Sequence, residues 1–235
     1  AVLAVLVDLD GDDGLELGPL TAALGSSERA GLARLVTDVG AAIAPDLEAL
    51  TGHEDSEIRR LALRVLASAD APRGAARLAG ALVDEVLDVR LEALSLAARL
   101  LRSATGGQEL ARRLAPLLDE RLAATDFQER AAAVTATAAL PASLAGASVA
   151  ARLGDASGFV REAAARALGT MRWQNAVPQL LAASHDRVTE VRLATVESLV
   201  ALGDPRARPR LAELAAADPE VRVRSAARML QPERP

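Results

Sequence analysis

The chain has 235 residues, 51% of them apolar and only 1% aromatic, and its formal net charge is −5. The core must therefore be built from Leu, Ala and Val, which favours close-packed helices over a β-sandwich. Cysteine is absent, which excludes a disulfide framework and thiol chemistry. The longest apolar run, residues 1–7, is too short to span a bilayer and no signal-peptide pattern is visible, so we expect a cytoplasmic protein.

A short phrase that begins with an acid and ends with Val-Arg recurs along the chain. Its clearest copies run from Asp84 to Arg90, from Asp155 to Arg161 and from Asp186 to Arg192. With looser copies included, the closing arginines are Arg29, Arg59, Arg90, Arg130, Arg161, Arg192 and Arg222. Their separations are 30 or 31 residues, with one of 40. Such a period is typical of a repeat array, so residues 1–235 are predicted to form one solenoid with a clipped repeat at each end.

Each repeat is expected to hold two helices. After a clipped helix at residues 1–9, helices are predicted at about 16–24, 29–39, 41–50, 56–68, 73–83, 86–102 and 108–123. Later first helices should begin near residues 127, 158, 189 and 219, and the second helices between them should span about 143–153, 176–183 and 205–216. The long interval places nine extra residues before Pro116, and this segment, 97–116, is a candidate binding region because repeat insertions often map to a binding face.

The N-terminal part of the chain is acidic. Residues 1–57 hold 12 acids and 2 arginines, a balance of −10, whereas residues 58–235 hold 20 acids and 25 arginines, a balance of +5. The acids of Asp8–Asp13 lack the Gly and Glu that an EF-hand loop needs, so we interpret them as a helix start, with an ion site as the alternative. The apolar helix at residues 1–9 would expose its outer face, which predicts end-to-end self-association or coverage by more chain.

Positions counted back from each closing arginine separate a core from a surface. Twelve residues before the five closing arginines from Arg59 to Arg192 stands a large aliphatic side chain, that of Leu47, Leu78, Leu118, Val149 or Leu180. Positions nearby on the second helices vary in chemistry, which is expected of a surface that selects a partner. The candidate partner-binding residues are Arg77, Arg112, Arg121, Ser148, Arg152, Gln179 and Arg210.

The repeated phrase and the prolines that open second helices resemble the HEAT-repeat family, most closely its short repeats of about 30 residues seen in phycobilisome lyases. The resemblance implies an all-α fold, a right-handed α-solenoid of stacked antiparallel helix pairs, with first helices on the convex face and second helices on the concave face. It also implies a structural ladder between adjacent repeats, formed by Asp84, Arg90, Asp155, Arg161, Asp186 and Arg192. His53, Ala124 and Ala216 replace the acid six residues before an arginine, so three ladder pairs should be altered.

No motif for catalysis, cofactor binding or metal binding is present in the sequence. His53-Glu54 is similar to the His-Glu pairs of deoxyhypusine hydroxylases, but that family needs several such pairs to hold two irons. No Cys/His cluster has zinc spacing, no Gly-rich loop fits a phosphate, and no residues are placed as a triad. We therefore predict no enzyme activity, no cofactor and no metal.

Nucleic-acid binding is disfavoured, because the densest arginines, between Arg206 and Arg224, are interspersed with acids. We interpret Phe127 and Phe159 as hydrophobic staples at helix starts and Trp173 as packing between repeats. The leading hypothesis is a non-enzymatic scaffold or adaptor that binds a protein partner. The alternatives are an accessory subunit of an enzyme, or a chromophore-lyase-like protein, and a nucleic-acid-binding HEAT-like protein.

Overall fold

A computed structural model describes residues 44–103 and 107–229, and every regular element within these ranges is a helix. The predictions made for residues 1–43, including the apolar helix and the Asp8–Asp13 loop, lie outside the described residues. Residues 44–50 are helical, as the periodicity predicted. The predicted all-α solenoid is confirmed.

Eleven labelled α-helices follow in two alternating sets within the described ranges. The first helices of the repeats are α4 (Ser56–Ala69), α6 (Leu87–Arg102), α8 (Phe127–Thr137), α10 (Gly158–Thr170), α12 (Thr189–Leu202) and α14 (Val221–Arg228). The second helices are α5 (Ala71–Ala81), α7 (Gly107–Arg121), α9 (Ala142–Ala151), α11 (Val177–Ala183) and α13 (Arg208–Ala217). Three 3₁₀ turns accompany them, η1 (Arg152–Gly154), η2 (Gln174–Ala176) and η3 (Pro205–Ala207).

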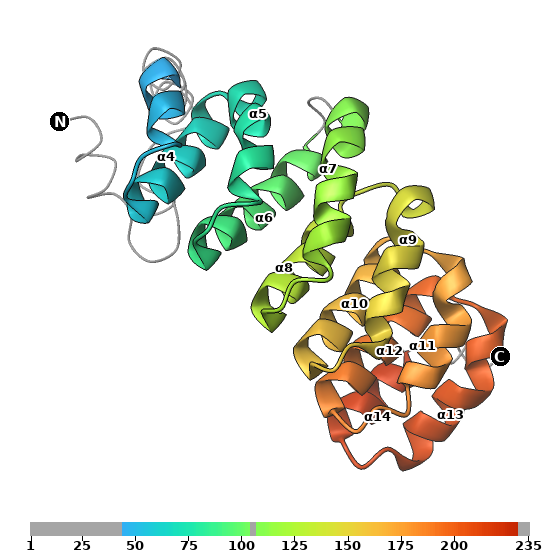
Figure 1. Cartoon of the computed structure of the whole chain (residues 1–235). Helices are drawn as coiled ribbons and strands as arrows, with labels where there is room; N and C mark the ends of the chain where they lie inside the picture. Colours follow the sequence, from blue (N-terminus) through green and yellow to red (C-terminus); the bar gives the residue numbers. More distant parts are fainter. Residues whose placement is uncertain (1–43, 104–106, 230–235) are drawn as a thin grey trace, which may run out of the picture.

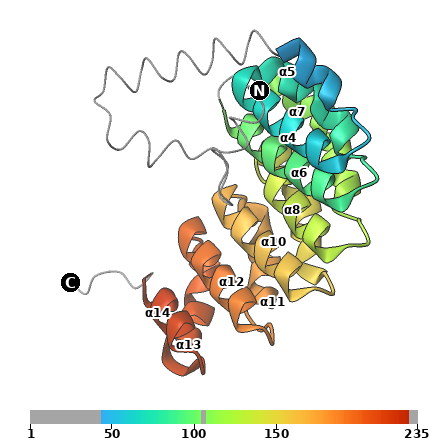
Figure 2. The same ribbon diagram turned by 90° about the vertical axis from the view of Figure 1, so that its left-hand side faces the viewer.

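The two sets form two adjacent rows. Each first helix packs on the first helices before and after it. The second helices α5, α7 and α9 contact one another in the same order, and the later second helices contact the neighbouring repeats through η1, η2 and η3. Figures 1 and 2 show the rows running from α4 at one end to α13 and α14 at the other. Because each repeat touches only its neighbours, the molecule has one continuous core that extends along the whole stack.

Short polar side chains fix where the helices begin. The Asp55 carboxylate accepts a hydrogen bond from the Glu57 N–H at the start of α4, and the Asp126 carboxylate accepts from the N–H groups of Gln128 and Glu129 at the start of α8. These bonds satisfy amide donors that a helix cannot satisfy internally. The recurring acids therefore place the helix starts along the chain.

The columns predicted from the sequence form the core. The aliphatic side chains twelve residues before the ladder arginines, Leu47, Leu78, Leu118, Val149 and Leu180, are at most 1% exposed. Between adjacent first helices stand the small buried residues Ala62, Ala93, Ala133, Ala164 and Thr195. Small side chains allow the helix backbones to approach closely, so this column sets the spacing of the stack.

Trp173 packs between two repeats, as the sequence indicated. Its ring lies so close to Gly146 of α9 that a Cβ atom added there would stand 2.5 Å from the ring atoms. Phe127 and Phe159 differ from the prediction, because they are not staples. They are the first residue of α8 and the second of α10, and their rings stack on each other with centroids 5.6 Å apart, at 41% and 68% exposure. A staple requires a residue that precedes the N-cap, and neither ring has that position.

Candidate binding surface and the inter-repeat ladder

The recurring phrase forms a bidentate ion pair between neighbouring repeats. In the clearest case, Nε and Nη2 of Arg161 donate to the two carboxylate oxygens of Asp186 at 2.7 and 2.9 Å. Nη1 of Arg161 donates to the backbone carbonyls of Asp155 and Ala156 at 2.8 and 3.1 Å. Both side chains are 11% exposed. The guanidinium therefore ties the loop of its own repeat to the loop of the next one.

The same geometry recurs along the stack. Each arginine reaches forward to an aspartate 25 or 26 residues later, in the pairs Arg59–Asp84, Arg130–Asp155, Arg161–Asp186 and Arg192–Asp218. Of the six predicted ladder residues, only Arg161 and Asp186 pair with each other. Asp84, Asp155 and Arg192 pair with Arg59, Arg130 and Asp218, which the sequence interpretation did not place in the ladder. Arg90 pairs with a glutamate.

That glutamate replaces a missing aspartate. Ala124 stands where the ladder aspartate would be, and Nη2 of Arg90 instead donates to Oε2 of Glu129 at 2.8 Å. Arg121 also donates to Glu129, at 3.3 Å, and the Glu129 side chain is 3% exposed. In other repeats this position, directly before the arginine, holds an apolar residue, which is buried at Val89, Val160 and Val191. In the sequence, Glu129 could have been recognised as this substitute, because it is an acid at a position that is otherwise apolar.

The altered pair at Ala124 gives a stability prediction. Nε of Arg90 is buried and has no hydrogen-bond partner among the described residues. We expect Ala124→Asp to supply the missing acceptor and to stabilise the fold by about 1 kcal/mol, since a buried unpaired donor costs roughly that much or more. Thermal unfolding of Ala124→Asp beside Ala123→Asp, an exposed neighbour, measures the effect. Equal melting temperatures for the two variants would contradict it.

The last described repeat corrects the predicted register. Arg224, not Arg222, has the ladder position, because its Nη1 donates to the carbonyls of Asp218 and Pro219 at 2.7 and 3.0 Å, in the manner of Arg161. Arg222 is 59% exposed on the surface beside Glu190 and Glu220. The ladder acid of this repeat is Asp218, six residues before Arg224, so Ala216 removes no pair. His53 likewise supplies its carbonyl to Arg59 at 2.9 Å, which any residue could do.

The ladder also explains why the pKa values of its aspartates are lowered. The pKa of Asp186 is lowered mainly by the hydrogen bond from Arg161, and those of Asp84 and Asp155 are lowered in the same way by Arg59 and Arg130. In each case burial opposes the shift and a backbone N–H two residues later adds to it. These groups are perturbed because they hold repeats together.

Three of the predicted partner-binding arginines are engaged inside the solenoid. Arg121 pairs with Glu129, Arg152 donates to the Leu122 carbonyl at 3.0 Å, and Arg210 donates to the hydroxyl and carbonyl of Ser184 at 2.8 and 3.1 Å. The last two contacts join the carbonyl-rich C-terminal end of one second helix to the next repeat. These three residues therefore support the stack.

The other predicted residues lie on the outer face of the second helices. Arg77 is exposed and pairs with Glu48 at 2.6 Å. Arg112 is exposed and makes no hydrogen bond or ion pair among the described residues, and Gln179 is exposed while Ser148 is half-buried. Gln179 lines a depression of the surface, described next. The structure thus brings no large set of the predicted residues together.

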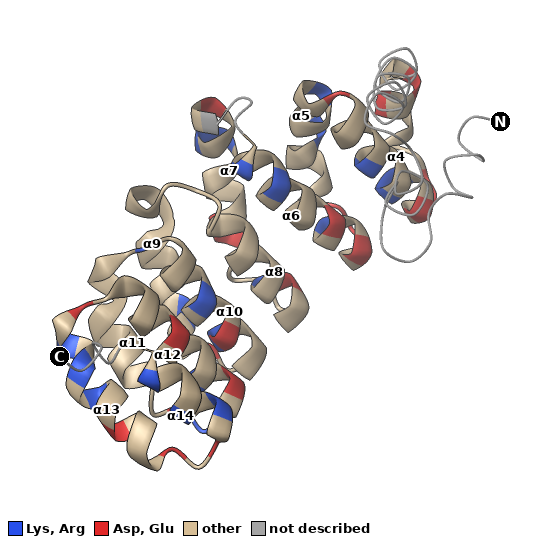
Figure 3. Cartoon of the chain, turned by 180° about the vertical axis from the view of Figure 1, so that it is seen from behind, with Lys and Arg blue, Asp and Glu red and all other residues tan. Residues whose placement is uncertain are grey.

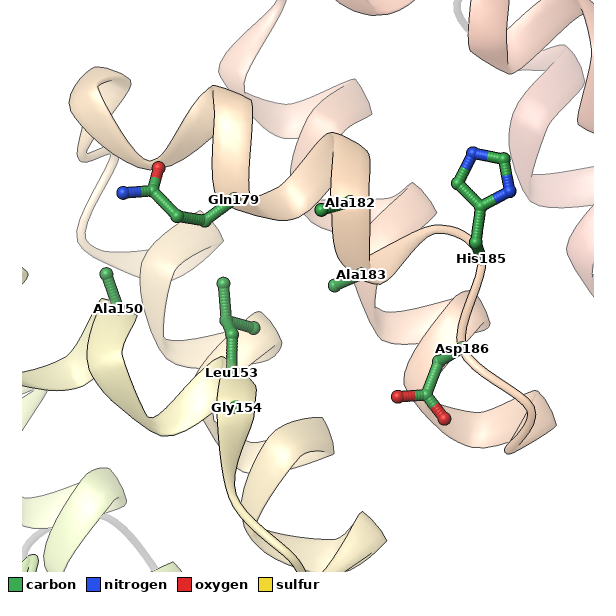
Figure 4. A pocket seen from close by; sticks show the side chains of 8 residues that line it. All are labelled: Ala150, Leu153, Gly154, Gln179, Ala182, Ala183, His185 and Asp186. Carbon is green, nitrogen blue, oxygen red and sulfur yellow. The ribbon is translucent and has the colours of Figure 1, made fainter.

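The depression is an open groove between α9–η1 and α11, with a volume of about 420 Å³. Figure 4 shows the residues that line it, Ala150, Leu153, Gly154, Gln179, Ala182, Ala183, His185 and Asp186. The Asp186 carboxylate is already bound to Arg161, so the groove offers chiefly apolar side chains, the Gln179 amide and the exposed His185 imidazole. Neither α9 nor α11 contains a charged residue, and both ribbons are tan in Figure 3.

The arginines that the sequence suggested as a nucleic-acid track are largely occupied. Arg206 pairs with Asp204 at 2.7 Å, Arg210 with Glu213 at 3.0 Å, and Arg222 with Glu190 at 3.3 Å. Arg206 lowers the pKa of Asp204 to about 2. A phosphate backbone would have to displace these carboxylates, which disfavours the nucleic-acid alternative.

The described residues contain no group of three or more His, Cys, Asp or Glu residues that could hold a metal ion. They also contain no helix long and apolar enough to cross a membrane. The cytoplasmic location stays a prediction.

The fold and the ladder define an α-solenoid of stacked helix pairs, and the comparisons agree. Residues 146–231 match the family model described as HEAT repeats, so HEAT repeats build this part of the chain, as predicted. Among curated proteins, none matches the sequence.

Solved structures show the same architecture. An engineered protein superposes with a TM-score of 0.60 at 18% identity, covering 80% of this chain and 94% of its own. YibA of Escherichia coli superposes with a TM-score of 0.58 at 17% identity, covering 97% and 95%. Human deoxyhypusine hydroxylase reaches a TM-score of 0.46 at 22% identity, covering 97% and 86%, a likeness too low to bear on activity.

Proposed function

We propose that the chain is a non-enzymatic scaffold that binds a protein partner along its second helices. The observation that carries this proposal is the mainly apolar groove between α9–η1 and α11, whose one carboxylate, that of Asp186, is already paired with Arg161. A partner that enters it displaces water from Leu153, Ala182 and Ala183 without removing a charge from solvent, and the Gln179 amide can fix its orientation. Such a surface, apolar with a few polar groups, is the usual core of a protein interface.

The arrangement of titratable groups supports the non-enzymatic part of the proposal. Among the described residues, the carboxylates with clearly shifted pKa values are the four ladder aspartates and Asp204, and each already has an arginine partner. A general acid or base needs a carboxylate free to exchange a proton with a substrate. The four ladder aspartates hold the repeats in place instead, and Asp204 caps the 3₁₀ turn η3 of its own repeat.

A charged side chain in the groove should strongly weaken partner binding. We expect Ala182→Arg to reduce retention of the partner about tenfold or more, because a guanidinium would be left buried against apolar atoms. The measurement is affinity capture with the immobilised chain, followed by titration of the retained protein. The matched control is Ala201→Arg, at an exposed alanine of α12, which should bind as the unchanged chain does. If Ala182→Arg and Ala201→Arg bind equally, the groove is not the site.

A further inference from the structure

The two phenylalanines of the chain form an aromatic pair on the surface. Phe127 begins α8 and Phe159 is the second residue of α10, and these two first helices lie side by side in Figures 1 and 2. Their rings stack with centroids 5.6 Å apart, yet the two residues are 41% and 68% exposed. The stack therefore joins two repeats without removing the rings from water.

Phe159 occupies a position that is polar in the other described repeats. Two residues before each ladder arginine, the side chain is exposed in every described repeat, and it belongs to Glu57, Asp88, Gln128, Phe159, Glu190 or Arg222. Glu190 and Arg222, from adjacent repeats, pair along this row at 3.3 Å. The repeat thus folds with a polar side chain at this position, and its architecture does not require the exposed ring of Phe159.

The aromatic pair has the size of an anchor point for a short segment. A phenylalanine side chain brings about 150–250 Å² of surface into an interface, so the two exposed fractions leave roughly 200 Å² of aromatic surface in water. An interface between folded proteins covers roughly 800 Å² on each partner. Because the rings already hold each other in place, they lose little freedom when a ligand covers them. The pair therefore suits one bulky apolar side chain on a peptide segment.

An unpaired arginine beside the pair indicates the charge of that segment. Val188, the residue before α12, lies against α10, because a Cβ added at Gly158 would stand 3.3 Å from its Cγ2. This contact places Arg187, the residue before Val188, on the loop next to Phe159. Arg187 is exposed, and its guanidinium makes no hydrogen bond or ion pair among the described residues.

The carboxylates on the neighbouring elements are already engaged. Glu162 of α10 pairs with Arg166 at 3.1 Å, and Asp186 pairs with Arg161 at 2.7 Å. The net charge left without a partner beside the rings is therefore the positive one of Arg187. A carboxylate is its natural complement.

We propose that the Phe127–Phe159 pair and Arg187 form a second binding surface, for a short peptide segment that presents a bulky apolar side chain next to a carboxylate. The apolar side chain covers the rings, and the carboxylate pairs with Arg187. The surface is formed by first helices, whereas the groove lies between second helices, and the inference does not depend on the groove. Salt weakens the exposed ion pair and leaves the apolar contact largely intact.

Selection from a phage-displayed library of random dodecapeptides, on the immobilised full chain, tests the proposal. The library is first passed over Phe159→Gln, which removes peptides that bind elsewhere. This variant should keep its fold, because Gln128 is the side chain at the same position of the preceding repeat, and circular dichroism checks it. We expect enriched peptides that combine Trp, Phe or Leu with Asp or Glu and bind the unchanged chain about tenfold tighter than Phe159→Gln.

Three further variants locate the bound peptides. Arg187→Gln should weaken them about threefold at low salt and remove the preference for Asp and Glu. Val83→Gln, at an exposed apolar residue that follows α5, should bind them as the unchanged chain does. Ala182→Arg, in the groove, should also leave them unaffected, so that the two surfaces can fail independently.

Three outcomes overturn the proposal. In the first, no peptide is enriched after passage over Phe159→Gln. In the second, the enriched peptides carry no acid and bind Arg187→Gln as tightly as the unchanged chain. In the third, sedimentation velocity shows a dimer of the unchanged chain and a monomer of Phe159→Gln, which would assign the aromatic pair to a second copy of the chain.

Discussion

Arg161→Ala should lower the free energy of unfolding by about 3 kcal/mol, because it leaves the Asp186 carboxylate nearly buried without its cation. The change also removes the donor to the carbonyls of Asp155 and Ala156, so the loops of two repeats lose their link. For a chain of this length the melting temperature should fall by roughly 6–12 °C. Circular dichroism during heating measures it. Arg166→Ala, which removes an arginine 53% exposed beside Glu162 and Glu197, should change stability by less than about 0.5 kcal/mol.

The pH dependence of Arg161→Ala distinguishes the ion pair from packing of the arginine stem. Arg161 holds the pKa of Asp186 below its usual value, so the pair stabilises the fold above the unfolded pKa of about 4 and loses that effect as pH falls through the lowered folded value. The stability gap between the unchanged chain and Arg161→Ala should therefore narrow between pH 7 and strongly acidic pH. A gap that stays constant would assign the loss to packing alone.

The helix pairs could be predicted closely because the signals for them are local. The starts of α8, α10 and α12 at Phe127, Gly158 and Thr189 agree with the prediction, since each follows an acid that sets the entering turn. The register of α14 could not be read from the Val-Arg dipeptide, which occurs at both Val221-Arg222 and Val223-Arg224. What decides between them is the acid six residues earlier, because Arg224 must reach back to the Asp218 carbonyl.

The binding surface was harder to predict because it depends on distances between repeats. Arg152 and Arg210 have the sequence character of exposed partner-binding residues, yet each reaches a carbonyl at the end of the preceding second helix. No pattern within one repeat reports how close that carbonyl lies. The groove beside Gln179 was hard to predict for another reason. It is formed where α9 and α11 have few large side chains, and a run of alanines in a helix is not a recognisable binding motif.

Gly74→Ala should destabilise the fold by about 1–3 kcal/mol, although alanine is the better helix former. Gly74 lies inside α5, where it meets α4, and a Cβ added there would stand 2.4 Å from the Cα of Ala67. The obstacle is backbone, not a flexible side chain, so the two helices of the repeat must separate. Separation would also open contacts of Leu78, which is fully buried one turn further along α5. Thermal and urea unfolding both report the loss.

Gly80→Ala in the same helix provides the matched control. A Cβ at Gly80 meets no atom within 4 Å, so this substitution should stabilise the fold by about 0.5–1 kcal/mol through helix propensity alone. The two variants share a helix, a chemical change and a propensity gain, and they differ only in the approach of α4. Opposite signs for the two variants would show that the close approach of α4 and α5 at Gly74 sets the geometry of the pair. If Gly74→Ala stabilises the chain as Gly80→Ala does, α4 and α5 can separate at no cost and the helix pair is not tightly packed.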